Sequence, residues 1–368
     1  MTFGGGGVYW LARPLHPLAW WLWALGLAVT AGHTTNPLLL GTIYGVACWV
    51  VLARRSDGPW AMAFRLYVVA GVLIVSIRVL FRILFGGGEG GTVLAPLPAI
   101  DLPVAAAGAS LLGDITAESL LAGLYDGARL ATMVVCLGAA NCLANPRRLL
   151  RVMPPALHEV STALVVAVSV FPQLAESVVR VRAARRLRPA VDTRRLPRLR
   201  ALVVTVIEDA LERSLMLASS MDSRGYGRSG GRSRRTDRLV GALMVTGLVG
   251  MCVGLYALLD VTTPRYLATP MLVAGVAVGV AGVGLSGRGV RRTAYRPERW
   301  RLAELVTVVS GVVPALAVTV AATPDVLHPS LGPLVWPSLT PLVLLGVLVA
   351  LTPAFGTPQP APVDAAAA

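Results

Sequence analysis

Lysine is absent from this chain, and all 33 basic residues are arginine. A phosphate-binding loop of the Gly-x-x-x-x-Gly-Lys-Ser/Thr type needs a lysine, so the sequence excludes a nucleotide site of that type. Charge is also scarce, because only 14% of the 368 residues are charged, whereas 55% are hydrophobic and the mean hydropathy is +0.69. A soluble domain carries about 25% charged residues. The composition therefore predicts a protein that lies mostly in lipid.

Cysteine and histidine are few, four of each. The cysteines lie in apolar runs without the spacing of metal ligands, at Cys48, Cys136, Cys142 and Cys252. We therefore expect buried, unreactive thiols, with no metal site and no bound cofactor. No arrangement of Ser, His and Asp indicates a nucleophilic site, so we expect no catalytic residues of that kind.

Long apolar runs make up most of the sequence. A bilayer core takes about 20 apolar residues as a helix, and eight runs come near that length. They cover residues 15–30, 36–53, 61–85, 120–144, 239–259, 269–286, 303–322 and 338–353. The predicted fold class is all-α: a polytopic integral membrane protein of about eight transmembrane helices, with a cytoplasmic helical insert between spans four and five.

Arginine placement predicts the topology. Arginine clusters follow spans two, four and six, whereas the loops 31–35, 86–119 and 323–337 carry none. Since arginine accumulates on the cytoplasmic side, we expect a multi-pass protein of the cell membrane with both termini in the cytoplasm. A further apolar stretch at 156–171 would send the arginine-rich residues 180–238 outside if it spanned. We therefore expect it not to span.

This topology divides the chain into four parts. They are an N-terminal transmembrane region of four spans (1–154), cytoplasmic arginine-rich helices (155–238), a C-terminal transmembrane region of four spans (239–355) and a disordered tail (356–368). Residues 180–238 hold 16 arginines against six acidic residues, a net charge of +10. The lipid bilayer is an expected partner of such a segment. Nucleic acid is not, because the segment lacks interleaved aromatic residues.

Two long helices are predicted in the cytoplasmic part. Residues 156–188 are expected to form one helix that bends at Pro172, because proline supplies no N–H to the backbone ladder. Residues 198–223 are expected to form the second. Helical spacing places an apolar set along one face of this second helix, which includes Val203, Val206, Ala210, Leu215 and Ala218.

Each of the two helices ends near an arginine, Arg188 or Arg224. Gly225 and Gly227 are expected to stop the second helix, since glycine readily adopts a positive φ. An arginine in that place has three interpretations. It can complement the helix dipole, worth about 0.3–1 kcal/mol, contact anionic lipid headgroups, or pair bidentately with a carboxylate of a partner protein. The apolar helix faces favour the partner.

The segment Ser220-Met221-Asp222-Ser223-Arg224-Gly225-Tyr226 resembles a motif of a known family. It is similar to a motif in the T components of energy-coupling factor transporters, the EcfT/CbiQ family. These proteins carry two paired Ala-Arg-Gly motifs, and the second motif reads roughly Ala-Met-Glu-Ala-Arg-Gly-Tyr. The first motif reads roughly Ala-Gln-x-Ala-Arg-Gly. Ala184-Arg185-Arg186-Leu187-Arg188-Pro189 occupies its place and departs from it at Leu187 and Pro189.

Other stretches also look like this family, especially its actinobacterial members. They are residues 145–154, 171–177 and 292–300, so that the resemblance runs from about residue 12 to 310. The segment 303–353 is an elaboration on the minimal family member.

The resemblance implies a non-catalytic subunit of an ABC importer for a vitamin or a transition-metal ion. Its partners would be two cytoplasmic ABC ATPases, which hydrolyse ATP, and a small membrane subunit, which binds the substrate. The arginine-tipped helices would seat in grooves of the ATPases. The residues carried over for this contact are Ala184, Arg188, Asp222, Ser223, Arg224 and Gly225.

An alternative is a membrane-integral enzyme that acts on a phosphorylated lipid or isoprenoid. It lacks paired carboxylates for a metal, because Glu208, Asp209 and Glu212 share their face with arginine. Two further arginines, Arg78 and Arg82, lie one turn apart inside the third apolar run. They are expected to snorkel or pair with an acid, or to contact the substrate-binding subunit.

Overall fold

The computed structural model describes residues 13–56, 63–85, 91–96, 98, 100–101, 110–153, 157–187, 195–225, 234–260, 265–287, 299–332 and 336–359. These residues form an all-α polytopic membrane protein, as the sequence predicts, with a few very short strands. The chain divides into two compact units. The first combines residues 1–149 with 298–368, and the second is residues 150–297.

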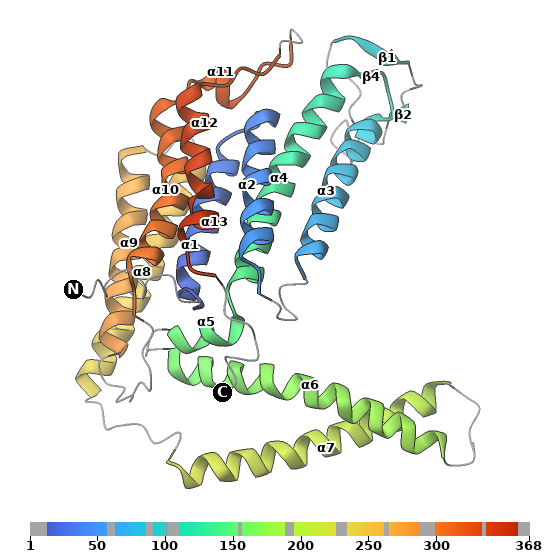
Figure 1. Ribbon diagram of the computed structural model, residues 1–368, viewed down its shortest axis with the longest axis vertical. Helices are drawn as coiled ribbons and strands as arrows, with labels where there is room; N and C mark the ends of the chain where they lie inside the picture. The colour runs from blue at the N-terminus through green and yellow to red at the C-terminus, as the bar shows by residue number, and fades with distance from the viewer. Residues whose placement is uncertain are drawn as a thin grey trace, which may run out of the picture. The chain divides into compact units, whose positions relative to one another are not determined.

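The first unit brings the two ends of the chain into one helical bundle (Figure 1). The elements are α1 (Pro17–Gly32), α2 (Pro37–Arg54), α3 (Phe64–Phe85), β1 (Val93–Ala95), β2 (Ile100–Asp101), β3 (Ser110–Leu111), β4 (Ile115–Thr116), α4 (Ala117–Leu143), α10 (Leu302–Ala321), α11 (Pro324–Leu327), α12 (Pro341–Leu348), η5 (Val349–Leu351) and α13 (Thr352–Gly356). Between α3 and α4, β1 pairs with β4 and β2 pairs with β3, both antiparallel. The short helix α5 (Pro146–Val152) follows α4.

Asn36 connects α2 to the C-terminal segment. Its Oδ1 accepts hydrogen bonds from the backbone N–H groups of Leu38 and Leu39, which caps the first turn of α2. Its Nδ2 donates to the backbone oxygens of Val326 and Ser338, both at 2.9 Å. The buried Asn36 amide therefore caps the start of α2 and binds the backbone of residues 290 and 302 positions away.

The bundle core lies where α1 crosses α10 and where α4 packs against α1, α2 and α3. Gly26 and Gly311 face each other at the α1–α10 crossing, where a side chain on either would overlap the other helix. Trp23 is fully buried there, and its Nε1 donates to the oxygen of Ala350 at 3.2 Å. The C-terminal elaboration is thus part of the core. The backbone oxygen of Gln359 accepts a hydrogen bond from the N–H of Arg13. The bundle therefore extends past residue 356, where the tail was expected to begin.

The second unit contains four long helices, α6 (His158–Arg186), α7 (Arg195–Ser223), α8 (Arg234–Leu259) and α9 (Arg265–Gly287). The helices α8 and α9 pack closely along their glycines, as small residues allow in membranes. A Cβ on Gly275 would lie 2.7 Å from the backbone carbon of Gly250 and 3.0 Å from the oxygen of Gly247.

We expect Gly275→Ala to destabilise the α8–α9 pair by about 1–3 kcal/mol, the usual cost of overpacking. The added methyl group meets backbone, which cannot rotate away. Gly279→Ala in the same helix is the matched control, because a Cβ there has no atom within 4 Å. The midpoint of thermal unfolding in detergent measures both. Equal midpoints for the two variants would contradict this close packing.

Seven helices are long and apolar enough to cross a membrane within the described ranges. Six of them coincide with expected spans, and the other two expected spans are the shorter apolar helices Pro17–Gly32 and Pro341–Gly356. The seventh is Val160–Ala184 of α6, which qualifies by length and composition. Arginine placement argues against its crossing, so its cytoplasmic position stays a prediction.

Candidate functional site

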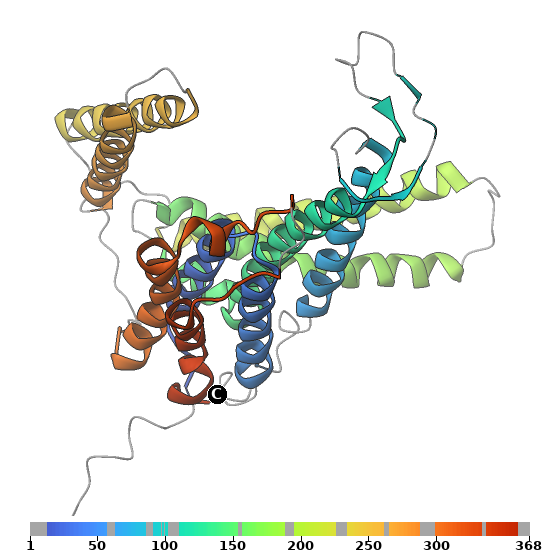
Figure 2. The ribbon, with the colours of Figure 1, turned by 90° about the horizontal axis from the view of Figure 1, so that it is seen from above.

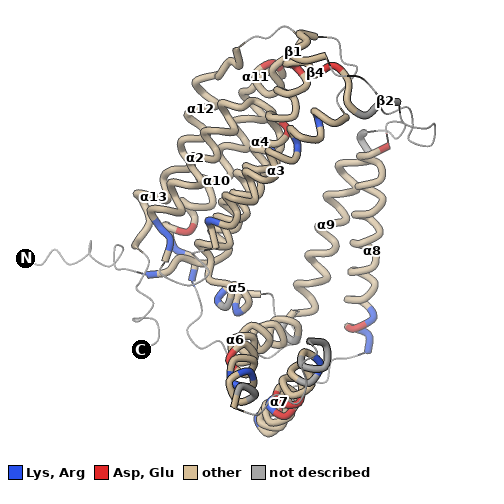
Figure 3. Tube along the Cα trace, turned by 90° about the vertical axis from the view of Figure 1, so that its right-hand side faces the viewer, with Lys and Arg blue, Asp and Glu red and all other residues tan. Residues whose placement is uncertain are grey.

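The two predicted arginine-rich helices are confirmed. The first, expected at 156–188, is α6 (His158–Arg186), and it continues through Pro172. The second, expected at 198–223, is α7 (Arg195–Ser223). Figure 3 shows charged residues on both helices. In α6 they lie at Glu159 and from Glu176 onward, whereas in α7 they occur along its length.

The helices α6 and α7 cross at a polar contact (Figure 1). Ser177 of α6 is 2% exposed, and its Oγ donates to Asp209 Oδ2 of α7 at 2.6 Å. Asp209 is also held by Arg213 one turn later, with Nε donating to Oδ1 at 3.2 Å and Nη2 lying 3.0 Å from Oδ2. We call Ser177, Asp209 and Arg213 the crossing contact. The sequence does not predict this contact, because helical spacing puts Asp209 on the charged face of α7.

The crossing contact favours the ionised carboxylate. The hydrogen bond from Ser177, followed by the charges of Arg213 and Arg180, lowers the pKa of Asp209 below its ordinary 3.8, against the raising effect of desolvation. The stabilisation from a lowered pKa is present above pH 3.8 and is lost as the pH falls through the lower folded value. Acid should therefore loosen the crossing only below about pH 4.

We expect Asp209→Asn to widen the distribution of crossing angles at neutral pH. It should also remove the loosening that acid causes in the parent chain. Spin labels at Ala167 and Ser219, two exposed positions about 15 Å along each helix from the crossing, measure the angle as a distance distribution. Glu208→Gln is the control, since Glu208 is the exposed neighbour on α7. A crossing that is equally narrow in Asp209→Asn at neutral pH would show that apolar packing alone fixes it.

The predicted apolar face of α7 has two parts. Val206 and Ala210 are half-buried at the crossing. Val203 is 48% exposed, Leu215 is 63% exposed and Ala218 is exposed as well. The crossing therefore covers only part of this face. The remaining part is apolar surface of the kind that binds partners or lipid.

Helix α7 ends directly before Arg224, as predicted. The N–H of Arg224 donates to Met221 O at 3.1 Å and that of Gly225 to Asp222 O at 2.9 Å. Gly225 has a φ of +76°, which confirms that glycine ends the helix, whereas Gly227 lies outside the described residues. Arg224 is exposed, with Asp222 and Ser223 exposed beside it. No hydrogen bond or ion pair joins the guanidinium to the described part of the chain, so its charge is available to a partner.

The first motif is described only as far as the end of its helix. Ala184 is exposed, and its oxygen accepts a hydrogen bond from the N–H of Leu187. Arg188 lies outside the described residues. That Arg188 ends the first helix as Arg224 ends the second, and contacts a partner in the same way, therefore stays a prediction.

The carboxylates of α7 do not form a metal site. Asp209 is engaged by Ser177 and Arg213, while Glu208 and Glu212 are exposed. Among the described residues, no three His, Cys, Asp or Glu side chains come together to hold a metal ion. The described cysteines are free, and Cys252 is exposed, contrary to the prediction that all four are buried.

The comparison with protein families decides the assignment. The family model for the cobalt transport protein, CbiQ, matches residues 11–236. The chain belongs to this cobalt transport family. No curated protein matches it. Its place in the family makes the chain a component of a membrane transport system, in agreement with its apolar helices.

The family match ends near the start of α8. It contains both arginine-rich helices and the Arg224 motif. The resemblance predicted from the sequence runs to about residue 310 and so extends beyond the family match. The stretch 292–300 lies outside that match.

Proposed function

We propose that this cobalt transport family member is the transmembrane coupling subunit of an energy-coupling factor importer. It would connect two cytoplasmic ABC ATPases to a small membrane subunit that binds a vitamin or a transition-metal ion. The observation that supports this most is the end of α7, where Gly225 terminates the helix and leaves Arg224 exposed beside small or short side chains. The family match includes this end.

The crossing contact suggests how the subunit transmits movement. A long helix acts as a rigid lever, and α6 and α7 are each 29 residues, about 43 Å. Ser177 and Asp209 lie well inside both helices, so a displacement of the α7 end at Arg224 is carried to the other side of the crossing. ATPase closure would move the α7 end, and the lever would pass this movement to the membrane subunits.

The proposal places residues 155–238 and both termini in the cytoplasm of a cell-membrane protein. The high density of arginine in 180–238 supports this side. The exposed apolar surface of α7 and the exposed Phe171 and Val179 of α6 would then be covered by the partners or lie against the membrane surface.

Purification of the tagged chain in mild detergent from its own membranes tests the proposal. Two ABC ATPases and a small membrane protein should be recovered with it in fixed ratio. Proteoliposomes that contain the complex should take up the substrate only with ATP. Recovery of the chain without ATPases from membranes that contain them would reject the coupling role.

A further inference from the structure

Helix α3 lies at the edge of the first unit, beside α4 (Figure 2). The faces of α1 and α2 are covered by α10, α12 and α13, and α4 is surrounded by α1, α2 and α3. Within this unit α3 packs mainly on α4, and Gly71 is its one buried residue. Most of the exposed residues of α3 are apolar.

Small residues of α4 set the position of two arginines on α3. A Cβ on Gly127 would lie 3.3 Å from Arg78 Cβ, and one on Gly123 would lie 2.8 Å from Arg82 Cγ. The side chains of both arginines therefore start close to the contact between α3 and α4. Arg78 and Arg82 lie one turn apart in the same apolar run, but their surroundings differ.

Arg82 has an acidic partner in the same unit. Its Nη2 lies 3.9 Å from Asp126 Oδ2 of α4, as expected for an arginine that pairs with an acid. Arg78 is exposed, and the hydrogen bonds and ion pairs of the described residues do not include its guanidinium. It is therefore a charge inside an apolar helix without a counter-charge among them.

The depth of Arg78 argues against a lipid headgroup as its partner. It lies seven residues before the end of α3, about 10 Å along the axis. The Cα–Cβ bonds of a helix tilt toward its N-terminus, so the side chain of Arg78 starts toward the middle of the helix and away from the nearer interface. Snorkelling works against this direction, and an unpaired guanidinium in hydrocarbon is costly.

Phe81 and Phe85 lie next to Arg78 along the same side of α3 by helical spacing. They are 55% and 48% exposed, and their rings stack with centroids 5.7 Å apart. Aromatic surface around a buried charge pair is typical of protein interfaces. The apolar stretches of α8 and α9 in the second unit contain no Asp or Glu between Leu239 and Leu259 or between Arg265 and Gly287, so this hairpin supplies no carboxylate inside the membrane.

We propose that Arg78, Phe81 and Phe85 form a binding surface for a membrane-spanning helix of the substrate-binding subunit, which presents a carboxylate to Arg78. The inference rests on the proposed function for the identity of the partner. The chemistry of the partner follows from the surface of α3 itself: the partner helix is apolar and carries an acidic residue at the depth of Arg78.

The test uses the full chain in nanodiscs of phosphatidylcholine. The probe is a synthetic membrane-spanning peptide of about 20 Leu and Ala residues with one Glu at the depth of Arg78. A matched peptide carries Gln instead. Energy transfer between labels on the chain and the peptide measures binding. We expect the Glu peptide to bind at least about tenfold more tightly than the Gln peptide.

Arg78→Leu and Arg78→Gln should each remove this preference. Ser76→Leu should keep it, because Ser76 lies on the opposite side of α3 by helical spacing and its Oγ bonds to its own backbone at Val72 O. ATPase recovery should be unchanged in all three variants. Loss of ATPases from the parent chain would reject the proposed function and leave the peptide measurement intact.

Three results would overturn the inference. The first is equal binding of the two peptides to the parent chain. The second is an unchanged preference in Arg78→Leu and Arg78→Gln. The third is loss of the Glu preference when phosphatidylglycerol replaces phosphatidylcholine, which would identify an anionic lipid headgroup as the partner of Arg78.

Discussion

Arg224→Glu should abolish the recovery of ATPases with the chain while leaving its membrane insertion unchanged. Under the proposed function, the exposed guanidinium beyond α7 enters a groove and pairs with a carboxylate. Removing one member of a buried charge pair typically costs about 3–5 kcal/mol, which corresponds to a loss of affinity of a hundredfold or more. Reversal adds repulsion between two carboxylates. The amount of ATPase recovered per chain from matched detergent extracts measures the effect, and ATP-driven uptake should fall with it.

Arg234→Glu is the matched control for charge reversal. Arg234 is the first residue of α8 and is exposed. A glutamate is favourable in a first helical turn, so this variant should fold and bind the ATPases normally. Arg188→Glu should reduce ATPase recovery less than Arg224→Glu. Equal recovery from Arg224→Glu and Arg234→Glu would mean that Arg224 only complements the dipole of α7.

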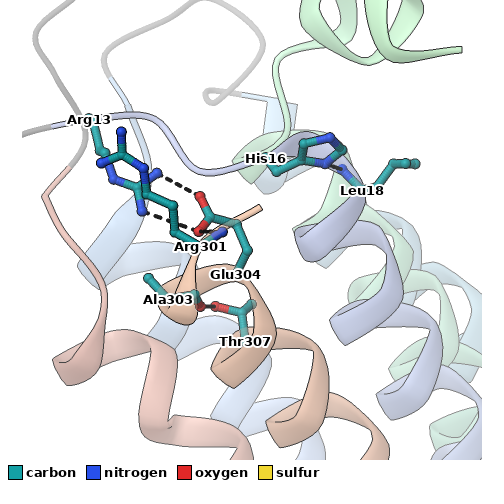
Figure 4. A network of polar contacts seen from close by, with 7 residues as sticks. All are labelled: Arg13, His16, Leu18, Arg301, Ala303, Glu304 and Thr307. Atoms are coloured by element: carbon teal, nitrogen blue, oxygen red, sulfur yellow. Dashed lines mark hydrogen bonds and ion pairs between the residues drawn. The ribbon is translucent and has the colours of Figure 1, made fainter. Parts of the chain in front are cut away.

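Glu304→Met should lower the stability of the first unit by about 3 kcal/mol, the lower end of the cost of breaking a buried ion pair. The Glu304 side chain is 1% exposed, and its Oε1 lies 2.6 Å from Arg13 Nη1 (Figure 4). Its Oε2 accepts hydrogen bonds from Arg13 Nη2 and from the N–H of Arg301, the N-cap residue of α10. Without the carboxylate, Arg13 keeps its charge in a partly buried place and the first turn of α10 loses its cap.

The double variant Arg13→Met/Glu304→Met distinguishes the loss of the whole ion pair from the loss of one of its two charges. It removes both charges, so it should recover much of the stability that Glu304→Met loses, because two apolar side chains of similar size replace a buried pair at little cost. The unpaired N–H of Arg301 should leave a residual loss. The midpoint of thermal unfolding in detergent measures all three chains. A double variant that loses the sum of both single changes would show that the two charges do not act as a pair.

The helices were predictable because long apolar runs and helical spacing are local properties of the sequence. Gly225 was predictable for the same reason, since the end of a helix depends on a few neighbouring residues. Arg224 could be proposed as a contact because its motif is short and continuous, although its binding partner stays a prediction. The exact tail boundary was not predictable, because the hydrogen bond between Arg13 and Gln359 joins distant residues.

Contacts between helices were not predictable from one sequence. Asp209 looked like one of several surface acids until the crossing placed Ser177 against it. Arg78 and Arg82 have the same local pattern, and only the position of Asp126 on α4 distinguishes them. The glycines of α8 and α9 were read as part of apolar spans, although their backbone contact depends on the register between two helices. Such pairings require the angle and register of the packed helices, which local spacing does not contain.

The ion pair between Arg13 and Glu304 joins residues 291 positions apart. During synthesis, α1 and α2 therefore emerge long before α10, α12 and α13, the helices that cover them. Contacts between such distant segments form slowly, because a long loop must close first. A nascent or truncated chain that lacks these last helices exposes the glycine and tryptophan surface of α1 to the bilayer. The core of the first unit can therefore close only after α10, α12 and α13 have been made, which is late in synthesis.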